Sequence, residues 1–271
     1  MTAQHVAILA IPRTGTNYLC DLISKFDEID SLYEIFHKDA VYLGNNEKLR
    51  INIIEHLNKK YDLKIKDFRS TAFINFVSQN PQALLDIIAQ KSNQKYTSFK
   101  IFSSHLPRQK LSKLIIKNSQ ITKIIVKRNL LDVYLSNRIA QQTNKWGKTD
   151  TSKFKLEFDD DDFMKWFTNQ NKYYSFIESE LTNSQQPINI LQYETIHSFQ
   201  NNQEKFQYLF DFFQSIGLQL DRKNLFGLAQ KELDKNIRKK QDRRKSTLEK
   251  LSNPNTLIDA LKNYELEFLL V

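Results

Sequence analysis

Four short apolar runs along the chain have the length of buried β-strands. Each spans six or seven residues and gives way to a polar stretch. Short runs bounded in this way are typical of strands that are covered on both faces. The runs occupy residues 6–11, 96–102, 121–127 and 188–193.

The stretches between these runs have the periodicity of amphipathic helices. Apolar residues return there every three or four positions, which is the pattern of a helix with one buried face. Pro81 and Pro107 stand where helices often begin, because proline is tolerated in the first turn. The predicted helices cover residues 16–26, 46–60, 81–91, 107–117, 130–142, 160–181 and 197–214.

Strands that alternate with helices predict an α/β fold. Right-handed crossovers then place helices on both faces of a mostly parallel sheet. Ligands of such sheets bind beyond the carboxyl ends of the strands. We therefore expect a site in the loops that follow residues 11, 102, 127 and 193.

The first of these loops, Pro12-Arg-Thr-Gly-Thr-Asn17, contains Gly15, one of five glycines in the chain. A strand, a tight glycine turn and a helix start aim backbone N–H groups and a helix dipole at one point, which suits a phosphate or sulfate. The Gly-Lys-Ser/Thr ending of a Walker A loop is missing. A structural corner with no ligand also fits this pattern.

A second motif follows the run at 121–127. Arg128 leaves the strand, and Ser136 comes eight residues later, two turns into the next predicted helix. A guanidinium and a hydroxyl at this spacing can converge on one phosphate. A surface arginine and an ordinary helical serine would give the same sequence pattern.

Charge narrows the classes of partner. The net charge of +9 favours polyanions or anionic small molecules, with nucleic acid as the broad alternative. The charge is segregated, since residues 235–245 hold seven Lys/Arg and residues 157–162 hold five carboxylates. This segregation favours distinct sites over one continuous face for a nucleic-acid backbone.

Composition also bears on the compartment. No apolar run approaches the roughly 20 residues of a membrane helix, and the first residues lack the charged start of a signal peptide. Cys20 is the one cysteine, which excludes an internal disulfide framework. These features predict a cytoplasmic protein that does not enter a membrane, with Cys20 as a small buried apolar residue.

Taken together, the two motifs resemble those of the sulfotransferases that use 3′-phosphoadenosine-5′-phosphosulfate. The loop at 12–17 resembles their 5′-phosphosulfate loop, and Arg128 with Ser136 resembles their 3′-phosphate motif. The resemblance implies a P-loop-like three-layer αβα sandwich with a mostly parallel sheet. It further implies one domain over 1–271, whose basic segment 235–271 covers the donor site.

Smaller pieces resemble the bacterial branch that includes trehalose and lipopolysaccharide-type sulfotransferases. That branch has a Leu-Cys-Asp/Glu-Leu sequence after the loop and a glutamate next to aromatic residues further on. The broader family has a Tyr-Glu pair at a later strand end and a Lys-Gln in a basic C-terminal segment. The corresponding pieces here are Leu19-Cys-Asp-Leu22, Tyr33-Glu-Ile-Phe36, Gln142-Thr-Asn-Lys-Trp146, Tyr193-Glu194 and Lys239-Lys-Gln241.

The resemblance assigns donor-binding residues, and the product left in the site would be adenosine 3′,5′-bisphosphate. The adenine would meet Tyr193, and cations of the basic segment would fold over the 3′-phosphate. The implied donor-binding residues are Arg13, Thr14, Gly15, Thr16, Asn17, Arg128, Ser136, Tyr193, Arg238 and Lys240.

Catalysis of sulfuryl transfer needs charge stabilisation on the leaving oxygen and a base for the acceptor. Arg13 stands where many relatives carry lysine, so either Arg13 or Lys100 could supply the charge. Glu34 and His105 are alternative bases, with His37 third. Residues that could contact the acceptor are Tyr33, Phe36, His37 and Trp146. The scattered histidines and single cysteine predict no metal site.

Two alternatives and the acceptor stay open. A kinase would need a Mg²⁺-binding Ser/Thr after lysine and a Walker-B aspartate, and a nucleic-acid-binding protein would need a continuous basic face. The acceptor is expected to be a small molecule, such as a sugar or natural product, with a hydroxyl or amine. Carboxylates at 157–162 could attract a cationic one, such as a saxitoxin-type guanidinium compound, or could stabilise a helix start. The oligomeric state is open.

Overall fold

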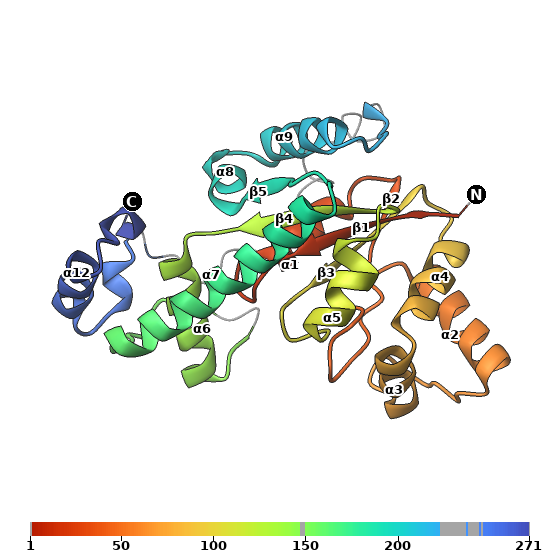
Figure 1. Ribbon diagram of the computed structural model, residues 1–271, viewed down its shortest axis with the longest axis horizontal. Helices are drawn as coiled ribbons and strands as arrows, with labels where there is room; N and C mark the ends of the chain where they lie inside the picture. The colour runs from red at the N-terminus through yellow and green to blue at the C-terminus, as the bar shows by residue number, and fades with distance from the viewer. Residues whose placement is uncertain (1, 147–149, 223–236, 238–243, 245, 271) are drawn as a thin grey trace.

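A five-stranded parallel sheet forms the centre of the computed structural model, which describes residues 2–146, 150–222, 237, 244 and 246–270. The strand order is β2-β3-β1-β4-β5, and each neighbouring pair is parallel (Figure 1). The α/β class with a parallel sheet is therefore confirmed. The strands are β1 (Gln4–Leu9), β2 (Ile29–Ser31), β3 (Tyr96–Ile101), β4 (Ile121–Lys127) and β5 (Ile190–Gln192).

Helices connect these strands and cover the sheet. None of those in the described part of the chain is both long and apolar enough to cross a bilayer. They are α1 (Thr16–Ile23), α2 (Glu47–Tyr61), α3 (Thr71–Gln79), α4 (Pro81–Lys91), α5 (Arg108–Leu111), α6 (Leu130–Thr143), α7 (Asp160–Asn183), α8 (Tyr193–Ser198), α9 (Asn202–Ser215) and α12 (Pro254–Asn263), with a π-helical turn η1 (Ser112–Ile116) and 3₁₀ turns η2 (Leu248–Lys250) and η3 (Glu267–Leu270).

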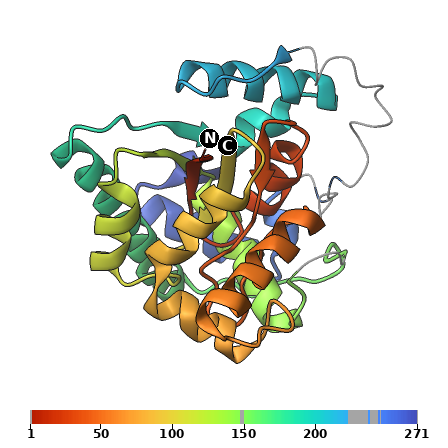
Figure 2. The ribbon, with the colours of Figure 1, turned by 90° about the vertical axis from the view of Figure 1, so that its right-hand side faces the viewer.

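The sheet divides the core into two layers, because successive strand residues point to opposite faces. Ala7 and Leu9 of β1 pack with helices α2 to α5 and α7, whereas Val6 and Ile8 pack with α1, α8 and α9. Figures 1 and 2 both show α9 on one side of the sheet and α2 to α4 on the other. This arrangement is the three-layer αβα sandwich expected.

A third apolar cluster lies beside α6, away from the sheet. It joins residues of α6 and the start of α7 to α12 and to Leu156, Phe158 and Leu251. Leu156 and Leu251 also form a parallel bridge. The packing therefore fastens the end of the described chain against α6, the helix that carries the second motif.

Some sequence-based predictions need correction. The stretch 197–214 is two helices, α8 and α9, and Tyr193 begins α8 instead of ending a strand. The stretch 107–117 is the short α5 followed by η1. The sequence analysis missed β2 because Ile29-Asp-Ser31 is neither long nor apolar, and it also missed α3 and α12.

Candidate active site

The loop after β1 has a conformation that suits its glycine. Arg13 and Gly15 both have left-handed backbone angles, with φ of 73° and 79°. A Cβ at Gly15 would lie 2.1 Å from Cε2 of Tyr193. Gly15 is also the N-cap of α1 and has no side chain to cap it. A helix start of this kind presents backbone N–H groups that can bind an anion.

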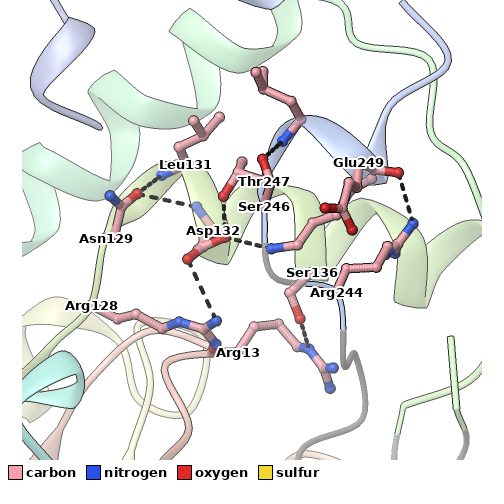
Figure 3. Close-up of polar contacts among 12 residues, drawn as sticks. Arg13, Arg128, Asn129, Leu131, Asp132, Ser136, Arg244, Ser246, Thr247 and Glu249 are labelled. Carbon is pink, nitrogen blue, oxygen red and sulfur yellow. Dashed lines mark hydrogen bonds and ion pairs between the residues drawn. The ribbon is translucent and has the colours of Figure 1, made fainter. Parts of the chain in front are cut away.

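The two sequence motifs are joined directly. Nε of Arg13 donates a hydrogen bond to Oγ of Ser136 at 3.0 Å, and an NH1 group of Arg128 donates to the carbonyl oxygen of Arg13 at 3.0 Å. Figure 3 shows both arginines and Ser136 side by side. Residues more than 100 positions apart thus meet where β1 and β4 end.

The site concentrates positive charge. Burial and the neighbouring Arg128 lower the pKa of Arg13, although Tyr193 opposes this shift. Guanidinium groups stay protonated in proteins, so both remain cations. Nε of Arg128 is buried and has no hydrogen-bond partner among the described residues. Two adjacent cations with an unsatisfied donor are the arrangement that an anionic ligand would complete.

An aromatic group borders these cations. The Arg128 guanidinium lies 4.2 Å from the centre of the Tyr193 ring, within cation–π range. The Tyr193 ring stacks on His197, with 3.9 Å between ring centres, and His197 contacts Tyr18. The stacking contact with His197 and the cation–π contact with Arg128 thus hold Tyr193 over Gly15.

A second polar cluster centres on Glu34. Its carboxylate lies 2.7 Å from Nζ of Lys100, 3.5 Å from Nε2 of His105 and 3.9 Å from Nε2 of His37. Lys100 comes from β3, and its Nζ also donates to Oδ1 of Asn17 in α1. The structure therefore brings together Glu34, Lys100 and His105, which the sequence offered as separate candidates, and Lys100 links them to the first motif.

The hydrogen bonds of His105 fix its neutral tautomer. The backbone N–H of Phe102 donates to Nδ1 of His105, so the ring proton of the neutral form is on Nε2, which faces Glu34. Burial lowers the pKa of His105, although Glu34 opposes this. Burial would raise the pKa of Glu34, but His105 and Lys100 outweigh it and lower this pKa to about 2. Glu34 is therefore a carboxylate at neutral pH.

Other predicted residues surround this cluster. Tyr33 is buried, has φ of 64° and donates from its hydroxyl to Asp21 at 2.5 Å. Phe36 is buried edge-on against Phe99, with ring centres 5.8 Å apart. Both side chains flank Glu34 from within the core, and their contact with an acceptor stays a prediction. His37 accepts from the backbone N–H of Asp39 at 3.1 Å.

The remaining residues predicted for the site differ in how far they are buried. Thr14 and Thr16 are buried, and the Thr14 hydroxyl donates to the carbonyl oxygen of Ile11 at 2.8 Å. Trp146 is half exposed, and its carbonyl oxygen accepts from NH1 of Arg13 at 2.8 Å. Arg238 and Lys240 lie outside the described residues.

Residues that the sequence motifs do not include organise the second motif. Asn129 is the N-cap of α6, where its Oδ1 accepts from the backbone N–H groups of Leu131 and Asp132. The backbone N–H of Asn129 donates to Glu194 at 2.8 Å. An asparagine one residue before a predicted helix was the available signal.

The acidic segment has a structural role. Asp159 caps α7 by accepting from the backbone N–H of Asp162 at 2.9 Å. Asp162 in turn accepts from Tyr134 at 2.6 Å and pairs with Arg138. Tyr134 packs in the apolar cluster beside α6, whereas Ser136 faces Arg13. These contacts support the helix-start interpretation for Asp159 and Asp162, and the attraction of a cationic acceptor by the acidic segment stays a prediction.

Comparisons with known proteins place the chain in a family. Within the described residues, no group of His, Cys, Asp or Glu side chains is arranged to hold a metal ion. A comparison with curated protein sequences finds no match. The family model for the sulfotransferase domain matches residues 3–257, nearly the whole chain. The match extends from β1 to α12 and includes both motifs, so the chain belongs to the sulfotransferase domain family and is a sulfotransferase.

Proposed function

We propose that this enzyme transfers a sulfuryl group from 3′-phosphoadenosine-5′-phosphosulfate to a hydroxyl or amine of a small molecule. The observation that carries the proposal is the convergence of Arg13, Arg128 and Ser136 at the ends of β1 and β4. Two cations and a hydroxyl there suit a donor that carries a phosphate on the 3′-oxygen of its ribose and a phosphosulfate on the 5′-oxygen.

The chain's own atoms fit this donor. The unpartnered Nε of buried Arg128 is a donor that an anion would satisfy, and the space above Gly15 is too tight for any side chain beside Tyr193. Arg128 and Ser136 would hold the 3′-phosphate, and the helix start at Thr16 the 5′-phosphosulfate. Tyr193, stacked on His197, would border the adenine.

Arg13 and Lys100 are suited to stabilise the departing charge. In sulfuryl transfer the S–O bond to the phosphate breaks while a bond forms between sulfur and the acceptor atom. Negative charge grows on the phosphate side, where fixed cations act without reorganisation. Arg13 cannot release its proton and acts by charge alone. Lys100 reaches the same loop through its hydrogen bond to Asn17.

Glu34 is proposed as the base that takes the proton of the acceptor. Its low pKa keeps it ionised, and His105 donates toward it from Nε2. In this arrangement His105 orients the carboxylate. His105 is the alternative base, and in that role its ring proton would be on Nδ1, so that Nε2 could accept the proton of the acceptor.

The acceptor is proposed as a small molecule with a nucleophilic oxygen or nitrogen near Glu34. The buried Cys20 and the absence of any other cysteine in the sequence support the proposal that the enzyme works in a reducing compartment such as the cytoplasm. We also propose that residues 1–271 form one domain and that its basic segment, 235–271, covers the donor.

The test is an assay of product mass with a donor that carries labelled sulfur and a panel of sugars, phenols and amines. Transfer of the label to an acceptor, unaffected by EDTA, is expected. Adenosine 3′,5′-bisphosphate should inhibit by competition with the donor. Failure of the protein to bind this nucleotide would contradict the donor assignment. A strict requirement for Mg²⁺ would favour a phosphate-transfer chemistry.

A further inference from the structure

The residue before Glu34 has an unusual backbone conformation. Tyr33 has φ of 64°, in the left-handed region that aromatic residues rarely adopt. Its carbonyl oxygen accepts from the backbone N–H of Lys100 at 2.8 Å, so the pairing with β3 continues two residues past the end of β2. A left-handed tyrosine costs free energy and persists only where surrounding contacts fix it. Because this turn directly precedes Glu34, it sets the direction in which that side chain leaves the sheet.

The side chain of Tyr33 ends on a buried acid. Its hydroxyl donates to Oδ1 of Asp21 in α1 at 2.5 Å, and both residues are buried. A hydrogen bond from a hydroxyl to a carboxylate is among the stronger ones, and a buried carboxylate depends on such donors. A second contact joins the same two elements, since Oγ of Ser31 donates to the carbonyl oxygen of Cys20 at 3.1 Å. The turn at Tyr33 is therefore fixed by Lys100 at its backbone and by α1 at its hydroxyl.

One face of α1 contacts two neighbours of Glu34. Asn17 and Asp21 are four residues apart, so they lie on the same face of the helix on successive turns. Asn17 accepts from Nζ of Lys100, which lies 2.7 Å from the Glu34 carboxylate. The first turn of α1 thus holds Lys100, and the second holds Tyr33. The helix that begins at the first loop therefore positions the residues around Glu34 from two sides.

Positioning of this kind acts on the rate more than on the binding of the donor. A base must lie within hydrogen-bond reach of the proton that it takes, and a displacement of about 1 Å can cost a factor of about 10² in rate. The Tyr33 hydroxyl is bound to Asp21 inside the core, so its route to the reaction is the position of Glu34. The donor phosphates are assigned to other residues, at the ends of β1 and β4.

We propose that Tyr33 and Asp21 are positioning residues, whose hydrogen bond holds the backbone turn that aims Glu34 at the acceptor. The proposal rests on the proposed function, since it takes Glu34 as the base. Neither the hydroxyl nor the Asp21 carboxylate exchanges a proton with the acceptor. Loss of the hydrogen bond should therefore lower kcat and leave the affinity for adenosine 3′,5′-bisphosphate unchanged.

The test measures kcat on the full chain, with labelled donor and the acceptor that wild-type protein uses best among the sugars, phenols and amines of the panel. Tyr33→Phe removes the hydroxyl and keeps the ring, and kcat should fall about tenfold to a hundredfold. Asp21→Asn keeps an oxygen that can accept from Tyr33, so its kcat should fall less. Asp21→Leu breaks the hydrogen bond without leaving a buried charge and should lose as much as Tyr33→Phe.

A matched control removes a buried hydroxyl at the other end of the sheet. The hydroxyl oxygen of Tyr96, the first residue of β3, accepts from the backbone N–H of Gln219 at 2.8 Å. Tyr96→Phe should keep kcat, whatever it does to stability. Melting curves verify that each variant is folded, and calorimetry measures its affinity for adenosine 3′,5′-bisphosphate.

A double-mutant cycle shows whether the hydroxyl acts through Glu34. In a Glu34→Gln background, Tyr33→Phe should cause little further loss of kcat, because no base is left to be positioned. A full further loss in that background would overturn the proposal, since the hydroxyl would then act on another part of the site.

The outcomes separate this proposal from the proposed function. A normal kcat in Glu34→Gln would show that Glu34 is not the base, and the positioning role would be wrong with it. A low kcat in Glu34→Gln together with a normal kcat in folded Tyr33→Phe or Asp21→Leu would overturn the positioning role alone. A nucleotide affinity that falls as far as kcat in Tyr33→Phe would make the hydrogen bond a general structural contact, against the proposal.

Discussion

The two polar clusters of the site treat charge in opposite ways. Around Arg128, two guanidinium groups share a buried space, and one donor atom has no partner among the described residues. Around Glu34, the carboxylate is matched by Lys100 and accepts from His105. The first cluster is arranged for an anion that arrives from outside, whereas the second is balanced by its own residues.

This difference suggests a division of work between binding and chemistry. An unbalanced cationic cluster gains free energy when it binds a phosphate, so it is suited to hold the donor. A balanced cluster gains little from binding an anion, but it keeps a base in a defined protonation state. Lys100 contacts both Glu34 and Asn17, and so it connects the two.

The largest effect is expected at Glu34. Glu34→Gln keeps the shape of the side chain and removes the proton acceptor, so kcat should fall by roughly 10²–10⁴ while donor affinity is unchanged. Steady-state kinetics and calorimetry measure the two. Glu47→Gln, at an exposed position of α2, is the matched control. An active Glu34→Gln enzyme together with an inactive His105→Ala enzyme would transfer the role of base to His105.

A loss of similar kind is expected at Arg13. Arg13→Ala removes a fixed cation from the loop, and kcat should fall by about 10²–10³, as for removal of one transition-state charge stabiliser. Arg50→Ala, in α2, is the control. A normal rate in Arg13→Ala would assign the charge stabilisation to Lys100 and weaken the contrast between the two clusters.

A smaller effect is expected at Ser136. Ser136→Ala removes a hydroxyl that accepts from Arg13 and faces the proposed 3′-phosphate. Donor affinity should fall by about 0.5–1.5 kcal/mol, the net contribution of a typical hydrogen bond. Ser198→Ala, which removes an exposed hydroxyl in α8, is the control. A fall in kcat as large as that predicted for Arg13→Ala would mean that Ser136 does more than bind the donor.

The balanced cluster also predicts a pH dependence of stability. Because the pKa of Glu34 is lowered from 4.5 to about 2, its ion pairs stabilise the fold above pH 4.5, and this contribution is lost as the pH falls toward 2. The difference in free energy of unfolding between wild type and Glu34→Gln should thus be constant near neutral pH and shrink below about pH 4.5. Urea unfolding at several pH values measures it. A constant difference down to about pH 3 would contradict the lowered pKa.

Much of the fold could be predicted from the pattern of apolar residues. The strand at 121–127 and the helix at 81–91 have the predicted bounds, because an apolar run between polar stretches and a proline at the helix start are strong local signals. The strand Ile29–Ser31 gave no such signal. It pairs with β3 through backbone hydrogen bonds, and this pairing depends on tertiary context more than on the local sequence.

The site was predictable to a different degree. Arg13, Arg128 and Ser136 stood in recognisable motifs, and the loop glycine explained the turn. The link from Lys100 to Glu34 joins residues from two separate strand ends, and the sequence had no sign of it. The same holds for Asp21 and Tyr33, whose hydrogen bond depends on how α1 packs beside β2.

The affinity of the protein for adenosine 3′,5′-bisphosphate, with and without Arg128, tests the central claim most directly. Wild-type protein should bind this nucleotide, and Arg128→Ala should weaken it by about 2–4 kcal/mol, the usual loss when one partner of a buried charge pair is removed. Glu34→Gln should bind it as wild type does. Unchanged binding in Arg128→Ala, or a loss in Glu34→Gln as large as in Arg128→Ala, would contradict the account of one cluster for the donor and another for the chemistry.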